Sequence, residues 1–251
     1  MSQFVVVIPV RLESQRLPSK PLADILGKTM IERVYAQARK SNAAEVIVAT
    51  DSAEIAAACK RFSATVEMTS KDHASGTDRI AEVAERLGWP EDQIVVNVQG
   101  DEPLIPPALI DQVAGLLEAD SDAGMATLMT PLADEAEYRD PNMAKVVADQ
   151  SGAAVYFSRA PIPASRDGKA PADARRHIGL YAYRVDCLAR LAAAPVAPPE
   201  RAERLEQLRA LWLGQRIVIA DAVALPPRGV DTEGDLEFIR DLVRQQQKVD
   251  S

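Results

Sequence analysis

Cysteine is scarce in this sequence, and its two occurrences have no spacing that a metal site would use. The 251 residues contain only Cys59 and Cys187. Each lies on a stretch that we expect to be helical, where a thiol acts as a small buried hydrophobe. We therefore expect a reducing, cytoplasmic setting and no thiol chemistry.

Long apolar runs and an excess of positive charge are also missing. Near the two ends, Phe4–Val10 and Ile217–Ala220 fall far below the ~20 apolar residues that cross a bilayer, and the opening residues lack the basic start of a signal peptide. Lys and Arg total 29 against 37 Asp and Glu, a formal net charge of −8. We therefore expect neither a membrane nor a nucleic acid as partner.

Two common phosphate-binding motifs are absent. The sequence contains neither a G-x-x-x-x-G-K-[ST] loop nor a G-x-G-x-x-G fingerprint. A Walker-type ATPase and a standard dinucleotide dehydrogenase would each need one of them. Hydrophobic residues make up 47% of the chain, however, which is enough for a substantial core.

The first half of the chain alternates strand and helix patterns. Phe4–Pro9 and Glu45–Thr50 are short apolar runs rich in β-branched residues, typical of strands buried on both faces. Further strands are expected at 65–68 and 93–98, with helices at 29–40, 53–62 and 77–87. Such alternation predicts an α/β fold with a mostly parallel sheet flanked by helices, and a ligand crevice at the carboxyl ends of its strands.

The alternation of strand and helix patterns ends at about residue 120. Strand patterns are expected at 125–131, 145–149, 153–158 and 179–184, with a loop over Pro161–Ala174. A helix is expected over Arg201–Leu213, a strand over Arg216–Ala220, and a closing helix over Thr232–Gln246. The economical interpretation is one domain over residues 1–251, with an inserted β-rich arm at about 130–190.

The loop after the first strand concentrates positive charge. Arg11, Arg16 and Lys20 lie within one short connection at the carboxyl end of a buried strand. Guanidinium forks and an ammonium group suit phosphate oxygens, so a triphosphate is the natural ligand. The alternative is a solvated basic loop that pairs with surface carboxylates.

Two carboxylates also lie in loops beside predicted strands or helices. Asp101 follows the strand that ends at Val98, and Asp231 precedes the last helix. Carboxylate oxygens are the ligands that Mg²⁺ prefers, so both residues are candidate metal ligands. Alternatively, Asp101 only starts a turn and Asp231 only caps a helix. Ser75 and Gly76, before another helix, either approach a nucleotide or form a plain cap.

Ordered motifs along nearly the whole chain resemble the sugar-acid cytidylyltransferases of the 3-deoxy-manno-octulosonate (KDO) type. The resemblance begins in the first loop and in the Asp24-Ile-Leu-Gly-Lys-Thr-Met-Ile31 segment. It continues in the following blocks: Val48–Asp51, Asp72–Arg79, Val96–Pro103, Tyr156–Ala160, Arg176–Tyr183, Leu205–Arg209 and Gly229–Thr232.

This resemblance implies a Rossmann-like nucleotide-diphospho-sugar transferase fold and a reaction. CMP would pass from CTP to KDO, giving CMP-KDO and pyrophosphate for lipopolysaccharide biosynthesis, with Mg²⁺ as cofactor. The protein would be a homodimer that uses the inserted arm. The alternatives left open are transfer to another sugar acid, such as an amino-substituted KDO analogue or a sialic acid, and a nucleotide-binding regulator without turnover.

The resemblance also implies residue roles. The catalytic set would be Arg11, Lys20, Asp101 and Asp231, the last two holding the metal. The nucleotide would contact Pro9, Val10, Arg11, Arg16, Lys20, Ser75, Gly76, Arg79 and Asp101, with His73 a weaker candidate. The sugar would contact Gln99, Arg159, His177, Tyr181, Glu206 and Gln207, although the two aromatic rings could equally pack in a strand and Glu206 could be one charge on a helix.

Three residues depart from the usual pattern of the resembling family. Val10 stands where Ala is usual, Leu12 where an aromatic residue is usual, and Ser19 where Gly is usual. If that Gly adopts a positive φ, Ser19 alters the loop backbone. The arm over Ser165–Arg175 is also shorter than in many proteins of this kind.

Overall fold

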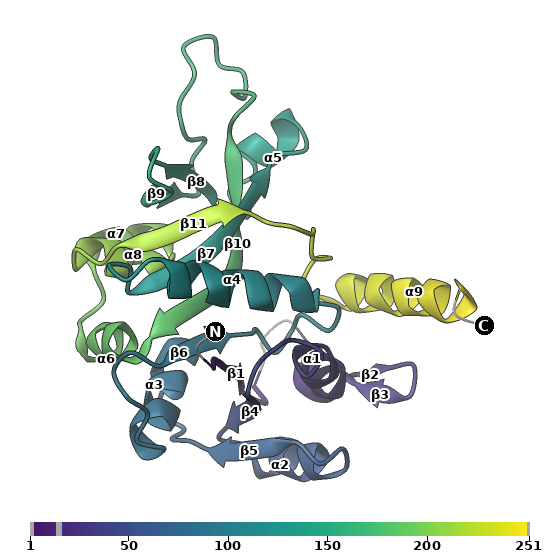
Figure 1. Cartoon of the computed structure of the whole chain (residues 1–251). Coiled ribbons are helices and arrows are strands. Elements are labelled where there is room, and N and C mark those ends of the chain that lie inside the picture. Colours follow the sequence, from purple (N-terminus) through teal and green to yellow (C-terminus); the bar gives the residue numbers. More distant parts are fainter. Residues whose placement is uncertain (1–2, 14–16, 250–251) are drawn as a thin grey trace. The chain divides into compact units, whose positions relative to one another are not determined.

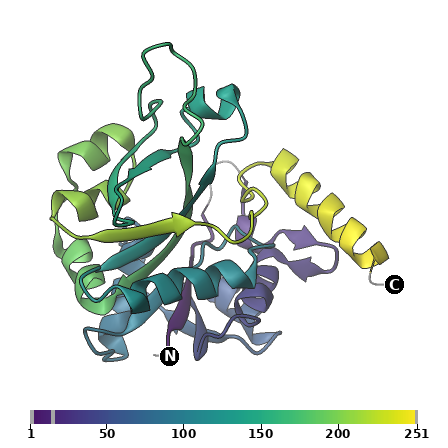
Figure 2. The same cartoon turned by 45° about the horizontal axis from the view of Figure 1, so that its top comes forward.

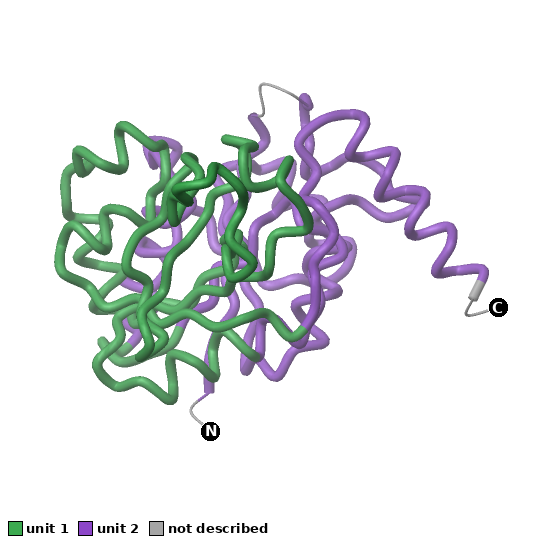
Figure 3. Tube along the Cα trace, turned by 90° about the horizontal axis from the view of Figure 1, so that it is seen from above, with its two compact units in different colours: residues 1–2, 90–94, 112–223 green, residues 3–89, 95–111, 224–251 purple. Residues whose placement is uncertain are grey.

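The computed structural model describes residues 3–13 and 17–249, and these form two compact units (Figure 3). Unit 1 comprises residues 90–94 and 112–223, and unit 2 comprises residues 3–89, 95–111 and 224–249. Each unit is therefore built from chain segments that are far apart in sequence. The expectation of one domain with an inserted arm stays a prediction.

Unit 2 contains a parallel sheet in the order β6-β1-β4-β5. Its strands are β1 (Val5–Val10), β4 (Glu45–Thr50), β5 (Thr65–Met68) and β6 (Ile94–Asn97). The apolar side chains of β1, β4 and β6 are almost wholly buried, as continuous apolar runs in a parallel sheet require, whereas the side chains of β5 are exposed or half-buried. β4 and β5 have the predicted bounds, and β1 and β6 differ from the prediction by one residue at each end.

The helices of unit 2 begin at caps that the sequence supplies. These are α1 (Met30–Ala38), α2 (Ala53–Lys60) and α3 (Gly76–Arg86), with the side chains of Thr29, Ser52 and Ser75 accepting from the first turns. Between β1 and α1 lie a short 3₁₀ turn, η1 (Lys20–Leu22), and a small hairpin of β2 (Asp24–Ile25) and β3 (Lys28–Thr29).

The last helix, α9 (Glu233–Val249), packs against the N-terminal part of unit 2. Figures 1 and 2 show it beside the β2–β3 hairpin. Its Leu236, Ile239 and Val243 share an apolar cluster with Ile25 and Met30. Burial of this cluster fixes the segment that precedes α9, which carries Asp231.

Unit 1 is built around antiparallel strands with one parallel addition. β10 (Arg175–Arg184) pairs antiparallel with β7 (Met125–Pro131) and β8 (Lys145–Ala148), β8 pairs antiparallel with β9 (Ala154–Ser158), and β11 (Ile217–Asp221) pairs parallel with β7. The β8–β9 hairpin turns at Gly152, whose φ is +73°. The loop over 161–174 extends away from these strands (Figure 1), as predicted.

Three helices of unit 1, α6 to α8, gather at one side of its strands (Figure 2). α6 (Val185–Ala193) is followed by α7 (Pro198–Glu203) and α8 (Gln207–Trp212), while α5 (Glu135–Arg139) precedes β8. The prediction of a single helix over 201–213 is wrong. Arg204 has φ +53°, a left-handed conformation that ends α7 and separates it from α8.

Two further elements differ from expectation. β10 begins at Arg175, four residues earlier than predicted, because Arg175 and Arg176 pair with both β7 and β8. α4 (Pro107–Ala119) was not predicted at all. The predicted α/β class, with mostly parallel strands flanked by helices, is confirmed. Among residues 3–13 and 17–249, no helix has the length and apolarity to cross a membrane.

Candidate active site

The loop after β1 turns sharply just before Lys20. Ser19 has φ +52° and ψ +30°, and the Lys20 backbone N–H donates to the Leu17 carbonyl (3.2 Å). Leu17 is buried and anchors the turn. Arg11 lies at the exposed end of β1, and Arg16 lies outside the described residues. Ser19, which stands where the resembling family usually has Gly, therefore adopts a positive φ.

Lys20 joins the two carboxylates that the sequence singled out. Its Nζ donates to Asp101 Oδ2 (2.7 Å) and to Asp231 Oδ1 (3.2 Å). The side chain of Lys20 is only 15% exposed, against 32% for Asp101 and 47% for Asp231. The Val230 N–H also donates to the Asp101 carbonyl (2.9 Å), which ties the two loops together. Residues separated by 211 positions thus meet at one ammonium group.

Asp231 is held by the first turn of α9. The carboxylate of Asp235 accepts from the backbone N–H groups of Asp231 (3.1 Å) and Thr232 (2.9 Å), and from the Thr232 hydroxyl (2.8 Å). The Thr232 hydroxyl and these backbone donors lower the pKa of Asp235. The Asp231 backbone is therefore fixed at a helix start, and its carboxylate accepts from the Lys20 ammonium group.

Glu102 is a site residue that the sequence reasoning missed, although it stands beside Asp101. Burial, and secondarily the charge of Asp101, raise the pKa of Glu102 to about 8. Its Oε2 is buried, and within the described part of the chain no hydrogen-bond partner reaches it. At neutral pH the negative charge of this loop therefore rests mainly on Asp101.

Two glycines let neighbouring loops approach the end of β1. A Cβ on Gly76 would lie 3.0 Å from Pro9 Cγ, and a Cβ on Gly100 would lie 2.9 Å from Val10 Cγ2. Ser75 and Asp78 form a reciprocal capping box, so α3 starts at a fixed place beside Pro9. The predicted nucleotide contacts Pro9, Val10, Ser75 and Gly76 are thus brought together within unit 2.

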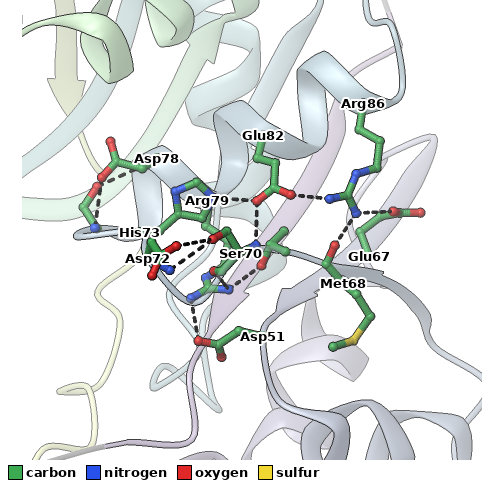
Figure 4. Close-up of polar contacts among 12 residues, drawn as sticks. Asp51, Glu67, Met68, Ser70, Asp72, His73, Asp78, Arg79, Glu82 and Arg86 are labelled. Atoms are coloured by element: carbon green, nitrogen blue, oxygen red, sulfur yellow. Dashed lines mark hydrogen bonds and ion pairs between the residues drawn. The ribbon is translucent and has the colours of Figure 1, made fainter.

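Arg79 does not point into open space as a free phosphate ligand would. It is 4% exposed, and its guanidinium donates to Thr69 Oγ1, to the Ser70 carbonyl (3.3 Å) and to Asp51 Oδ2 (3.3 Å) (Figure 4). Its observed contacts are with the loop that precedes α3 and with Asp51, which follows β4. The predicted contact between Arg79 and a nucleotide stays a prediction.

In unit 1, β10 places two predicted sugar contacts together. The rings of His177 and Tyr181 lie 5.3 Å apart between centroids, and Phe157 lies 5.0 Å from His177. His177 Nε2 is 2.9 Å from Thr127 Oγ1. Burial lowers the pKa of His177 to about 3 and raises that of Tyr181 well above its ordinary value. Both side chains are therefore neutral hydrogen-bonding groups at physiological pH.

α8 begins with the other predicted sugar contacts of unit 1. Glu206 is half-buried and Gln207 is buried. Among the residues that the structure describes, none accepts a hydrogen bond from the buried Gln207 Nε2. An unsatisfied buried amide costs free energy, so this donor suits a hydroxyl-bearing ligand. Gln99 belongs to unit 2, where it follows β6.

The guanidinium group of Arg159 donates hydrogen bonds to backbone carbonyls. It donates through Nε to the Glu203 carbonyl (2.6 Å), through Nη1 to Pro141 (2.8 Å) and through Nη2 to Arg204 (3.4 Å). The buried Lys145, which sequence reasoning missed, donates to the Arg159 carbonyl (2.8 Å). These contacts brace the chain before α8, and the contact predicted between Arg159 and a sugar carboxylate stays a prediction.

Comparisons with known proteins show the family of the chain. The chain belongs to the cytidylyltransferase family, whose profile matches residues 5–217. It is 54% identical, over 96% of this chain and 98% of the relative, to the 3-deoxy-manno-octulosonate cytidylyltransferase of Pseudomonas syringae pv. tomato. It is 53% identical, over 96% of this chain and 95% of the relative, to the 3-deoxy-manno-octulosonate cytidylyltransferase of Polynucleobacter necessarius.

A solved structure is also similar. The structure of CMP:2-keto-3-deoxy-manno-octonic acid synthetase complexed with CTP aligns with a TM-score of 0.91 and 41% sequence identity. The alignment covers 98% of this chain and all of the other. The resemblance inferred from the ordered motifs is confirmed.

Proposed function

We propose that this protein transfers CMP from CTP to KDO, with release of pyrophosphate. The observation that carries the proposal is the meeting of Lys20 with Asp101 and Asp231, a cation and two carboxylates at the ends of loops in an α/β unit. The names and coverage of the relatives, and the CTP complex of the similar structure, supply the substrates.

The anomeric hydroxyl of KDO would attack the α-phosphorus of CTP. The new bond joins the sugar oxygen to phosphorus while the hydroxyl proton passes to water. The bond from phosphorus to the bridging oxygen breaks, and that oxygen leaves with pyrophosphate. Lys20 and Arg11 would hold the triphosphate, and Ser75, Gly76, Pro9 and Val10 would approach the nucleotide. Arg16, outside the described residues, remains part of this proposed set.

Mg²⁺ is the proposed cofactor, and the donor set fits it. Asp101 and Asp231 both lie within hydrogen-bonding distance of one cationic nitrogen, so two carboxylates already converge on one point. Residues 3–13 and 17–249 contain no group of three or more Asp, Glu, His or Cys side chains suited to a metal. The two aspartates would hold an ion that neutralises phosphate charge when bound, the remaining ligands coming from elsewhere.

The sugar is assigned to unit 1. His177 and Tyr181, both neutral, and the unsatisfied amide of Gln207 are suited to hydroxyl groups, and Glu206 adds an acceptor. Gln99 in unit 2 stays in the proposed set. A homodimer and a cytoplasmic location belong to this proposal, and the exposed Val155 and Tyr156 of the hairpin strand β9 support a subunit contact there.

Pyrophosphate release tests the reaction directly. The purified protein is supplied with CTP and Mg²⁺, with and without KDO, and with EDTA as a control. Release that requires KDO and is abolished by EDTA is the expected result. Release with a sialic acid or an amino-substituted KDO analogue but not with KDO would assign another sugar acid, and CTP binding without any release would favour a regulator.

A further inference from the structure

The loop between β5 and α3, residues 69–75, is held by side chains from the helix that follows it. Glu82 Oε2 accepts from the Ser70 backbone N–H (2.8 Å) and lies 2.5 Å from His73 Nε2 (Figure 4). Arg79, one helical turn earlier, contacts Thr69 and the Ser70 carbonyl. Side chains of α3 therefore hold the loop at its beginning and in its middle.

The end of the same loop is fixed against β1. The Ser75 hydroxyl and backbone exchange hydrogen bonds with Asp78 (both 3.1 Å), and Gly76 lies against the Pro9 ring. Ser70 and His73, which Glu82 contacts, are thus in the same short loop as Ser75, and Gly76 follows it beside Pro9.

Glu82 differs from an ordinary surface carboxylate. Its side chain is 22% exposed, and its other oxygen accepts from Arg86, which lies 3.7 Å from Glu67 and also donates to the Met68 carbonyl. Although partial burial raises the pKa of Glu82, the donors Ser70, His73 and Arg86 lower it overall. The carboxylate is therefore ionised at neutral pH and held from two sides.

We propose that Glu82 is a positioning residue for nucleotide recognition: by holding Ser70 and His73, it places Ser75 and Gly76 beside Pro9. The proposal rests on the proposed function, in which these residues approach CTP. Glu82 itself does not touch the nucleotide. Its effect should therefore fall on CTP affinity and not on the sugar or the chemical step.

Replacement of Glu82 separates this role from a general structural one. Glu82→Ala should raise the KM for CTP and the Kd for CTP about tenfold, the size expected for losing charge-assisted hydrogen bonds. The KM for KDO and kcat at saturating CTP should stay within about twofold of wild type. Glu82→Gln, which keeps an oxygen acceptor for Ser70, should recover part of the loss.

The matched control is Glu85→Ala, which removes the same charge from an exposed position of the same helix. Hydrogen exchange of the 69–75 amides should accelerate in Glu82→Ala and not in this control. If Glu82→Ala does not fold, Glu82→Gln, which keeps the size of the side chain and removes its charge, should raise the Kd for CTP about threefold.

Equal CTP affinity in Glu82→Ala and Glu85→Ala would overturn the proposal. So would a loss shared equally between CTP and KDO, or a fall in kcat alone. The Kd for CTP is measured by calorimetry and needs no turnover. Failure of the wild-type protein to release pyrophosphate would therefore contradict the proposed function, whereas unchanged CTP binding in the variants would contradict the role of Glu82.

Discussion

At the scale of single residues, the backbone of Ser19 helps determine where Lys20 points. A left-handed φ of +52° is uncommon for a residue with a Cβ atom, and it occurs here one residue before the side chain that joins Asp101 to Asp231. The strain is small enough to be outweighed by the buried Leu17 and the hydrogen bonds of the turn.

We expect Ser19→Gly to stabilise the protein. Gly adopts φ +52° without a clash, so relief of the Cβ penalty should raise the free energy of unfolding by about 1 kcal/mol, partly offset by the greater freedom of the unfolded chain. Urea denaturation measures this. Ser19→Ala, which keeps the Cβ, should show no such gain, and equal stability of both variants would contradict the explanation.

Lys20 and a metal ion should compete for the same two carboxylates. The ammonium group of Lys20 lies 2.7 Å from Asp101 Oδ2 and 3.2 Å from Asp231 Oδ1. Lys20→Met removes this positive charge, so the variant should bind Mn²⁺ about tenfold more tightly than wild type without CTP. Paramagnetic resonance of free Mn²⁺ measures the affinity without any need for activity.

The control for this experiment is Lys28→Met, which removes an equal charge from an exposed lysine paired with Glu32 at 3.5 Å. Its Mn²⁺ affinity should match that of wild type. Identical affinity in Lys20→Met and wild type would mean that Asp101 and Asp231 do not form the metal site.

At the scale of elements, strands and capped helices could be predicted where local chemistry decides them. β4, β5 and β7 have the predicted bounds because β-branched runs end at clear turns, and α1 starts after Thr29 because its hydroxyl caps the helix. The break between α7 and α8 could not be predicted in this way. Arg204 has no local preference for a left-handed conformation, and the Arg159 guanidinium that contacts its carbonyl is 45 positions away.

The His177 side chain of β10 should make the free energy of unfolding depend on pH. Burial lowers the pKa of His177 to about 3, whereas in the unfolded chain it is about 6.5. Below pH 6.5 the unfolded state takes up a proton that the folded state does not bind. The stabilising contribution is therefore fully present above pH 6.5 and is lost progressively as the pH falls toward 3.

His177→Gln isolates this effect, because Gln does not titrate and can still reach Thr127. Between pH 7.5 and 5.0, wild type should lose about 2 kcal/mol more unfolding free energy than the variant. Urea denaturation at both pH values gives the difference. The other histidine, His73, is present in both proteins and therefore cancels in the comparison. The same pH dependence in both proteins would show that His177 is accessible to protons in the folded state.

At the scale of the whole molecule, most of the candidate site could be predicted only through the resemblance. Lys20, Asp101 and Asp231 come from three loops, and no local pattern states that they meet. The resemblance supplied that convergence. The hydrogen bonds of Arg159 and Arg79 to neighbouring backbone carbonyls, by contrast, could be found only in the structure. Glu102 and Lys145 were missed because their burial depends on packing between distant segments.

The proposed dimer can be tested at strand β9. Among the described strands β9 pairs only with β8, and it exposes 57% of Val155. Wild type should sediment at twice the mass of one chain, and Val155→Asp should sediment as a single chain because a charge there disfavours an apolar contact. Val223→Asp, at a valine that is 68% exposed elsewhere, is the control and should remain dimeric.

The assembly of unit 2 from three separate stretches also bears on how the protein is made. A ribosome delivers β1 and Lys20 early, Asp101 near the middle of synthesis, and α9 with Asp231 late. The apolar faces of Ile25 and Met30 stay uncovered until Leu236 and Ile239 emerge. A nascent chain therefore cannot complete the Lys20–Asp101–Asp231 contact until the segment before α9 has emerged.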